Sequence, residues 1–332
     1  MSPRILFVRT DRLGETVLNL PAAHALRQVM PRAHVILMVG AAVHELLVNH
    51  PGVDEVIAEP AWAGPWWQRA FHLSRLWRSW RIETVIVSNP KKEYHLAAWV
   101  AGIPHRVGYD CKWSALLTHR LPDRKALGGR HEVESNLDLV RLLGLPVSIP
   151  QWQWPSFARE QEEVFGLLAA QGINRSDPWI VIHPWTSHPA KQWPLPRYRG
   201  VIRAMSRDRS IGIVVIGGPE ERARVQAVLP KGLPVADLVG RLTLRQLAAL
   251  LQHARLLVSN DSGPVHLAAA MGTPTVVLFG TSDPATGPAR WGPWGQGHTV
   301  ICQPRLEQID VDEVLQAIHT HVSMVRPTQV AV

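Results

Sequence analysis

One segment near the C-terminal end places hydrogen-bonding residues directly before a helix. Asp261, Ser262 and Gly263 follow an apolar run, and Pro264 suits the first helical turn because its missing N–H is not needed there. Either Asp261 or Ser262 can cap the helix with its side chain. Gly263 lets a ligand approach the backbone closely, and a helix N-terminus attracts negative charge. We therefore expect an anion site that fits a diphosphate, with His266 one turn into the helix; the alternative is a well-capped buried helix without a ligand.

A second segment, HPWTSHPAKQWP, is rich in hydrogen-bond donors and also follows an apolar run. The hydroxyl groups of Thr186 and Ser187 and the ammonium group of Lys191 can all bind phosphate oxygens. A solvated loop that binds nothing is the alternative.

Acidic residues stand at the start of two further helices. Glu15 lies in RTDRLGETVLNLP, where it either acts as a general base or simply complements the helix dipole. Glu220 and Glu221 follow the glycine pair of GGPEER, where a carboxylate either accepts hydrogen bonds from a ribose diol or belongs to an N-terminal charge pair. The sequence leaves open which of these two glutamates matters.

Several common site motifs are missing. The first segment has one glycine instead of the G-x-G-x-x-G fingerprint, which disfavours a nicotinamide-dependent dehydrogenase. A Walker lysine motif, H-E-x-x-H, G-x-S-x-G and a clustered Cys/His set are also missing. We expect no metal ligands and no cofactor.

The elements that position these residues follow a repeated β-α pattern. Short apolar runs separated by helical segments predict parallel sheets covered by helices, and thus two consecutive Rossmann-like halves of the α/β class. The predicted strands are 5–8, 35–39, 55–58, 84–88, 179–183, 212–216, 256–259 and 275–279. The predicted helices are 14–30, 42–49, 66–80, 94–101, 132–143, 157–171, 198–207, 220–229, 244–253 and 264–271.

The proline-rich stretch PVSIPQWQWPS separates the two halves. It divides the chain into domains 1–150 and 151–332, and it is left open whether the final helix packs back on the first domain. Every motif above follows a predicted strand. Because ligands of open α/β sheets lie beyond the carboxyl ends of the strands, we expect the ligand in a cleft between the two domains.

Length and composition restrict the class of protein. The chain has 332 residues, 46% of them hydrophobic and 19% charged, which indicates a folded protein of about two domains. Its net charge of +8 is spread along the chain. Residues 1–150 include 18 basic and 13 acidic residues, and residues 151–332 include 17 basic and 14 acidic ones. Such a surplus attracts nucleic acid, anionic membranes or phosphorylated molecules. The dispersed charge and the lack of a nucleic-acid-binding motif disfavour nucleic acid.

Cysteine content and hydropathy indicate a cytoplasmic location. The two cysteines, Cys111 and Cys302, are too far apart in sequence to suggest a disulfide framework. The apolar run near the N-terminus is too short for a signal peptide, and no ~20-residue apolar stretch follows.

Four blocks together resemble a known family. RTDRLGETVLNLPA, HPWTSHPAKQWP, GGPEER and SNDSGPVHLAAAMGTPTVVLFG, in this order, resemble glycosyltransferase family 9, the ADP-heptose:lipopolysaccharide heptosyltransferases. The resemblance runs from about Ile5 to near residue 320, and the Asp-Ser-Gly-Pro-x-His block is its most specific part. It implies a GT-B fold, with the acceptor bound mainly by the first domain and the nucleotide-sugar donor by the second. It also implies inverting, metal-independent transfer of heptose to an anionic lipopolysaccharide core or similar glycan.

The resemblance assigns roles to individual positions. It makes Glu15 the catalytic base, where the family usually has aspartate, and Lys191 a catalytic ligand of the leaving phosphate. The remaining donor ligands that it implies are Thr186, Ser187, Glu220 or Glu221, Asp261, Ser262, Gly263 and His266. Other functions remain open: a GT-B transferase with another nucleotide sugar or acceptor, or an inactive sugar-nucleotide-binding protein.

Residues 66–81 form a basic amphipathic helix pattern. The apolar positions 66, 70, 73, 77 and 80 make one stripe, and arginines occupy the other faces. Either this helix faces the core and its arginines are merely solvated, or it meets an anionic acceptor or the cytoplasmic membrane leaflet. The second interpretation includes peripheral association with the membrane.

Overall fold

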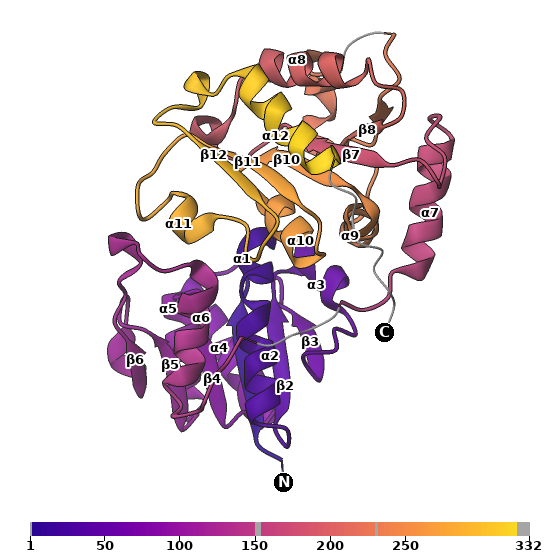
Figure 1. Ribbon diagram of the computed structural model, residues 1–332. Coiled ribbons are helices and arrows are strands. Elements are labelled where there is room, and N and C mark those ends of the chain that lie inside the picture. The colour runs from indigo at the N-terminus through magenta and orange to yellow at the C-terminus, as the bar shows by residue number, and fades with distance from the viewer. Residues whose placement is uncertain (1, 150–153, 230–231, 324–332) are drawn as a thin grey trace. The chain divides into compact units, whose positions relative to one another are not determined.

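The computed structural model describes residues 2–149, 154–229 and 232–323. The chain divides into two compact units, Met1–Ser156 and Phe157–Val332 (Figure 1). The expected domain boundary at residue 150 lies outside the described residues, as does the central part of the predicted linker.

The first unit contains a sheet of six parallel strands in the order β3-β2-β1-β4-β5-β6. Its strands are β1 (Arg4–Arg9), β2 (His34–Val39), β3 (Glu55–Ala58), β4 (Thr84–Val87), β5 (His105–Tyr109) and β6 (His119–Leu121). The parallel sheet is confirmed. The sequence did not reveal β5 and β6, because they are short and carry histidine and arginine instead of a continuous apolar run.

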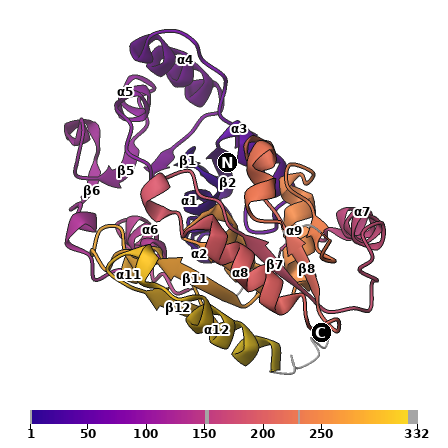
Figure 2. The ribbon, with the colours of Figure 1, turned by 90° about the horizontal axis from the view of Figure 1, so that it is seen from above.

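Helices cover both faces of this sheet (Figure 2). They are α1 (Leu13–Val17), α2 (Leu20–Val29), α3 (Ala41–Leu47), α4 (Trp66–Ser79), α5 (Lys92–Val100) and α6 (Glu132–Arg141). The single helix predicted for 14–30 is wrong: it is divided into α1 and α2. Pro21 explains the division, since proline is tolerated in a first turn but breaks a helix interior.

The predicted apolar stripe of α4 faces the core. Ala70, Leu73 and Trp77 are buried together with Leu6 and Val85 of the sheet. The core-facing interpretation of this stripe is therefore confirmed, whereas membrane or acceptor binding by the other faces of α4 stays a prediction.

The second unit also contains six parallel strands, in the order β12-β11-β10-β7-β8-β9. They are β7 (Trp179–His183), β8 (Gly212–Val215), β9 (Ala236–Asp237), β10 (Leu256–Asn260), β11 (Thr275–Phe279) and β12 (Thr299–Cys302). Its α-helices are α7 (Ala158–Ala169), α8 (Leu195–Met205), α9 (Leu244–His253), α10 (Gly263–Ala270), α11 (Pro288–Trp291) and α12 (Val311–Ser323).

One expectation for the second unit is wrong, and one point that the sequence left open is answered. The α-helix predicted for 220–229 is wrong: residues Pro219–Ala227 form a 3₁₀ helix, and the segment buries only Val225, so it lacks the apolar stripe that stabilises an α-helix. The final helix α12 packs within this unit, where Val314 and Ile318 join the main core. That core also contains the buried rings of Trp185 and Trp193.

In the described ranges, none of the helices combines the length and apolar character needed to cross a bilayer.

Candidate functional site

The strand order of each unit reverses at one point. In the second unit the reversal lies between β7 and β10, which pair with Ser259 opposite His183. Ligands of open α/β sheets bind beyond the carboxyl ends of the strands at such a point. The segments after these two strands are the donor-rich loop 184–193 and the start of α10, so the fold brings two of the predicted motifs together.

Lys191 and Asp261 form an ion pair at this edge of the sheet. Lys191 ends a short 3₁₀ helix, Pro189–Lys191, and Asp261 lies between β10 and α10. Burial raises the pKa of Asp261, and the nearby Lys191 ammonium group partly offsets that rise. The pair therefore brings the Lys191 ammonium group next to Asp261, two residues before α10 begins.

Ser262 contacts the end of β7 and does not cap α10. Its Oγ lies 3.2 Å from His183 Nδ1 and 2.9 Å from Ser259 Oγ, and His183 Nδ1 lies 3.0 Å from Ser259 Oγ. Burial lowers the pKa of His183 to about 4, so the ring is neutral near pH 7. The predicted side-chain cap is wrong: Ser262 has the N-cap position but its side chain makes no cap bond, and Asp261 pairs with Lys191 instead.

Asn260 fixes the loop 184–193 to the end of β10. Its Nδ2 donates to the Pro184 carbonyl at 3.0 Å, and its Oδ1 accepts from the Trp193 backbone N–H at 2.9 Å. Both ends of the loop are thus attached to one buried side chain. Sequence reasoning missed Asn260 and His183 as site residues, although each is the last residue of its strand.

The remaining predicted donor ligands differ in exposure. Thr186 is partly exposed and its Oγ1 accepts from the His188 N–H at 3.3 Å, while Ser187 is exposed. Gly263, the first residue of α10, is partly exposed, whereas His266, also in α10, is buried in the second unit.

Glu220 and Glu221 have different environments after β8. Glu221 Oε2 accepts the Gly218 N–H at 2.6 Å and thereby stabilises the start of the 3₁₀ helix. Glu220 is exposed. The preceding Gly217 packs against the Trp185 ring, because an added Cβ would lie only 2.6 Å from that indole.

In the first unit, Glu15 lies in α1, just beyond the carboxyl end of β1, and is half-buried. The strand order of this unit reverses between β1 and β4, so Glu15 also follows a switch-point strand. This position is compatible both with a general base and with a carboxylate that complements the helix dipole.

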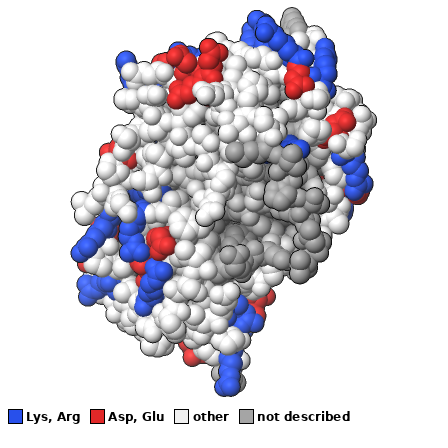
Figure 3. All heavy atoms as spheres, viewed as in Figure 1, with Lys and Arg blue, Asp and Glu red and all other residues white. Residues whose placement is uncertain are grey.

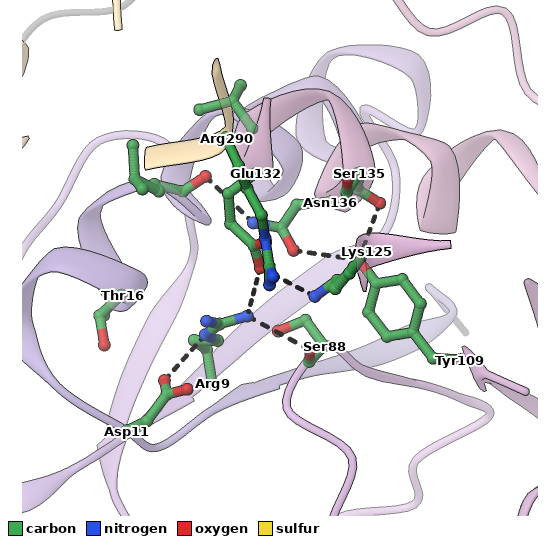
Figure 4. A network of polar contacts seen from close by, with 12 residues as sticks. Arg9, Asp11, Thr16, Ser88, Tyr109, Lys125, Glu132, Ser135, Asn136 and Arg290 are labelled. Atoms are coloured by element: carbon green, nitrogen blue, oxygen red, sulfur yellow. Dashed lines mark hydrogen bonds and ion pairs between the residues drawn. The ribbon is translucent and has the colours of Figure 1, made fainter. Parts of the chain in front are cut away.

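Arg9, the last residue of β1, is the centre of a buried ionic network (Figure 4). Its guanidinium group lies 2.8 Å from Asp11 and 3.4 Å from Glu132, and it donates to the Ser88 carbonyl at 3.2 Å. Burial alone lowers the pKa of Arg9, but the carboxylates of Asp11 and Glu132 outweigh it and the net pKa is raised. The network was not predicted; an arginine ending an apolar strand was its only signal.

Lys125 extends this network towards the surface. Its Nζ lies 2.8 Å from Glu132 and 3.9 Å from the centre of the Tyr109 ring. Over the strands β5 and β6, Figure 3 shows a group of Lys and Arg side chains on the surface. The exposed basic residues of this part of the chain are Lys112, Arg120, Arg124 and Arg130.

A second polar cluster occupies the same edge of the first sheet. Thr10 Oγ1 accepts hydrogen bonds from Asn89 Nδ2 and Lys91 Nζ, each at 3.1 Å, and contacts the hydroxyl of Tyr94. Tyr94 donates in turn to Glu59, and burial together with this carboxylate raises the tyrosine pKa. Both units therefore concentrate polar groups at the carboxyl ends of their strands.

Within the ranges that the structure describes, no three His, Cys, Asp or Glu side chains are grouped so that they could hold a metal ion.

Comparison with known proteins identifies related chains of similar length. Lipopolysaccharide heptosyltransferase 1 of Salmonella typhimurium is 26% identical over 328 residues, which cover 95% of this chain and 100% of the relative. Lipopolysaccharide heptosyltransferase 3 of Escherichia coli is 26% identical over 303 residues, covering 85% and 83%.

Solved structures share the fold. A family 9 glycosyltransferase from Veillonella parvula superposes with a TM-score of 0.86 at 21% identity, over 97% of this chain and 98% of that one. The E. coli ADP-heptose lipopolysaccharide heptosyltransferase II gives 0.79 at 22% identity, over 96% and 98%. The two parallel Rossmann-like units are thus those of the GT-B fold.

The family model of glycosyltransferase family 9 (heptosyltransferase) matches residues 75–319. This range includes the segments after β7, β8 and β10, whereas Glu15 precedes it. Because the matched range makes up most of the chain, the protein belongs to glycosyltransferase family 9 and is a glycosyltransferase.

Proposed function

We propose that the protein transfers heptose from ADP-heptose to a hydroxyl group of an anionic glycan, the lipopolysaccharide core or a similar acceptor, with inversion and without a metal. The observation that carries this proposal is the convergence of Lys191, Asp261 and the N-terminus of α10 at the switch point of the second unit, in a family 9 chain. We assign the nucleotide sugar to this edge.

The leaving group determines what this edge must do. As the bond between sugar and phosphate breaks, negative charge grows on the diphosphate while the sugar becomes oxocarbenium-like. Donors already in place at the diphosphate stabilise this transition state more than the ground state. Lys191, the hydroxyls of Thr186 and Ser187 and the backbone N–H groups at the start of α10 supply such a field. We propose that they replace a divalent cation.

The environment of Ser262 supports a positioning role near the same group. The neutral His183 and Ser259 hold its hydroxyl at 3.2 and 2.9 Å. Its orientation is therefore set before a ligand arrives, which lowers the entropy cost of binding. Asp261 holds the Lys191 ammonium group in the same way.

We propose Glu15 as the general base that accepts the proton of the acceptor hydroxyl. Inversion requires the base and the leaving group on opposite faces of the anomeric carbon. Glu15 follows β1, a strand at the switch point of the first unit, and this position supports its assignment as the base. The basic side chains near β5 and β6 support an anionic, lipid-linked acceptor, and we place the reaction at the cytoplasmic face of the membrane.

The test begins with calorimetric titration of ADP, UDP and GDP, in which ADP should bind most tightly. Release of ADP from ADP-heptose is then measured with a lipopolysaccharide-core acceptor, in the presence and absence of a chelator. Loss of activity in the chelator and its recovery with Mg²⁺ would contradict metal independence. Tighter binding of UDP or GDP would indicate a different donor, and ADP binding without transfer would indicate a sugar-nucleotide-binding protein.

A further inference from the structure

We propose that the outer face of α4 docks the protein on an anionic lipid bilayer. We call this face the α4 surface and define it by Trp62, Trp67, Phe71, Arg75 and Arg78. The proposal deepens the membrane location suggested above, but it does not depend on the identity of donor or acceptor.

Three aromatic side chains of the α4 surface are exposed although they lie in a folded unit. The exposed fractions are 37% for Trp62, 47% for Trp67 and 48% for Phe71. Solvated single apolar residues are common, but a group of large aromatic rings within ten residues indicates an interaction site. Tryptophan in particular favours the interface between water and acyl chains.

Helical geometry places the rings of Trp67 and Phe71 and two arginines on one side, while Trp62 precedes α4 and stacks on His72 of that helix. Residues 67, 71, 75 and 78 are spaced by 4, 4 and 3, so they lie within one stripe of the helix. The opposite stripe, with Ala70, Leu73 and Trp77, is already buried in the core. In Figure 2, α4 lies at the rim of the first unit, and the residues at 67, 71, 75 and 78 are all exposed, while Arg78 Nη2 donates to the Val100 carbonyl of α5 at 2.5 Å.

The charge of the residues around α4 indicates which kind of partner the α4 surface binds. No acidic residue occurs from Pro60 to Ile82, while this stretch contains four arginines. Arg69 pairs with Glu59 and Glu93 on the inner side, whereas Arg75 and Arg78 are exposed beside the aromatic rings. Interfacial aromatics flanked by exposed cations match a bilayer with anionic headgroups, since the rings enter the interface and the arginines meet phosphate.

The tryptophans fall into a buried group and a group on the α4 surface. Trp77, Trp185 and Trp193 are fully buried core residues, whereas Trp62 and Trp67 contribute to the α4 surface. Core packing explains the first group but gives no reason for large rings on a solvated helix face.

The experiment is flotation of the full-length protein with vesicles of phosphatidylglycerol and phosphatidylethanolamine, and with phosphatidylcholine vesicles, at low salt. The wild-type protein should float only with the anionic vesicles. Arg75→Gln with Arg78→Gln should weaken partitioning about 30-fold, because each basic residue near the surface contributes about fivefold. Trp67→Ser with Phe71→Ser should reduce it at least several-fold at unchanged net charge.

The matched control is Arg207→Gln with Arg209→Gln, which removes two exposed charges from the second unit. It should float like the wild type. Wild-type protein that stays in the aqueous fraction, or a Trp67/Phe71 variant that floats normally, would overturn the proposal; either result would leave a protein or glycan partner for this face. Transfer to a deacylated, water-soluble acceptor should be unchanged in all variants, and its absence in the wild type would count against the proposed reaction alone.

Discussion

Lys191 and Asp261 are ion-paired across the carboxyl ends of β7 and β10, although 70 residues separate them in the chain. The carboxylate is 9% exposed and the lysine side chain 37%. The burial of this pair is therefore intermediate between that of a surface salt bridge and that of a buried one. Removal of either charge should affect the remaining one. The pair also holds the Lys191 ammonium group next to Asp261, two residues before α10 begins.

Lys191→Met should lower both stability and nucleotide affinity. We expect a loss of about 1–2 kcal/mol in the free energy of unfolding, because a largely buried carboxylate loses its cation. Adding Asp261→Asn should restore most of this stability, since the buried charge is then gone. ADP affinity measured by calorimetry should remain at least tenfold weaker in both variants. Recovery of wild-type ADP binding in the double variant would show that Lys191 does not contact the diphosphate.

Glu15→Gln should strongly lower the rate of transfer while leaving nucleotide binding nearly intact. The substitution keeps the size of the side chain but removes its ability to accept a proton, and the loss expected for a general base is about 10² to 10⁴ in kcat. Glu15→Asp should retain part of the activity, because the carboxylate remains. Glu45→Gln changes an exposed acid of the same unit and serves as the control. Turnover of Glu15→Gln at the wild-type rate would refute the assignment.

Substitutions of the two glutamates after β8 should have different effects on stability and on ADP affinity. Glu221→Ala removes the acceptor of the Gly218 N–H and should cost about 1 kcal/mol of stability, with little change in ADP affinity. Glu220→Ala should instead weaken ADP binding several-fold and leave pyrophosphate binding unchanged, because only ADP carries the ribose diol. Calorimetry with both ligands distinguishes them. Equal weakening of ADP and pyrophosphate by Glu220→Ala would exclude ribose recognition.

The sequence predicted the elements whose apolar pattern is uninterrupted. Strands β7 and β11 and helix α9 were predicted with their observed bounds, because buried parallel strands are continuous apolar runs and an amphipathic helix has a periodic pattern. Strand β9 has only two residues, and β5 begins with His105 and Arg106, so neither has a readable pattern. The order of strands also depends on packing between distant segments, which local patterns do not contain.

The candidate site divides in a similar way. Lys191 and Asp261 were singled out because each follows a predicted strand, but the ion pair between them needs the adjacency of β7 and β10. The capping role expected of Ser262 followed from local propensity. Its contacts with His183 and Ser259 replace that local bond, since the strand ends bring those two side chains within 3.2 Å. Long-range contacts of this kind cannot be derived from the composition of one segment.

Acid should destabilise the protein through its buried histidines. Burial lowers the pKa of His183 to about 4, and burial together with His24 lowers that of His50 to about 3, against 6.5 ordinarily. Above pH 6.5 the folded and unfolded states are both neutral at these positions, so nothing is lost. As the pH falls from 6.5 towards 4, only the unfolded state takes up protons, and each histidine then lowers the free energy of unfolding by about 1.4 kcal/mol per pH unit.

Urea unfolding at pH 7.5 and 5.5 measures this effect. His50→Gln and His183→Gln should each recover about 1 kcal/mol of the difference between the two pH values, whatever they cost at pH 7.5. The exposed His188→Gln variant controls for the loss of a histidine without burial. Stability that is the same at both pH values in the wild type would mean that the two buried rings are protonated in the folded state. In that case His183 Nδ1 would carry a proton and would donate to Ser259 or Ser262.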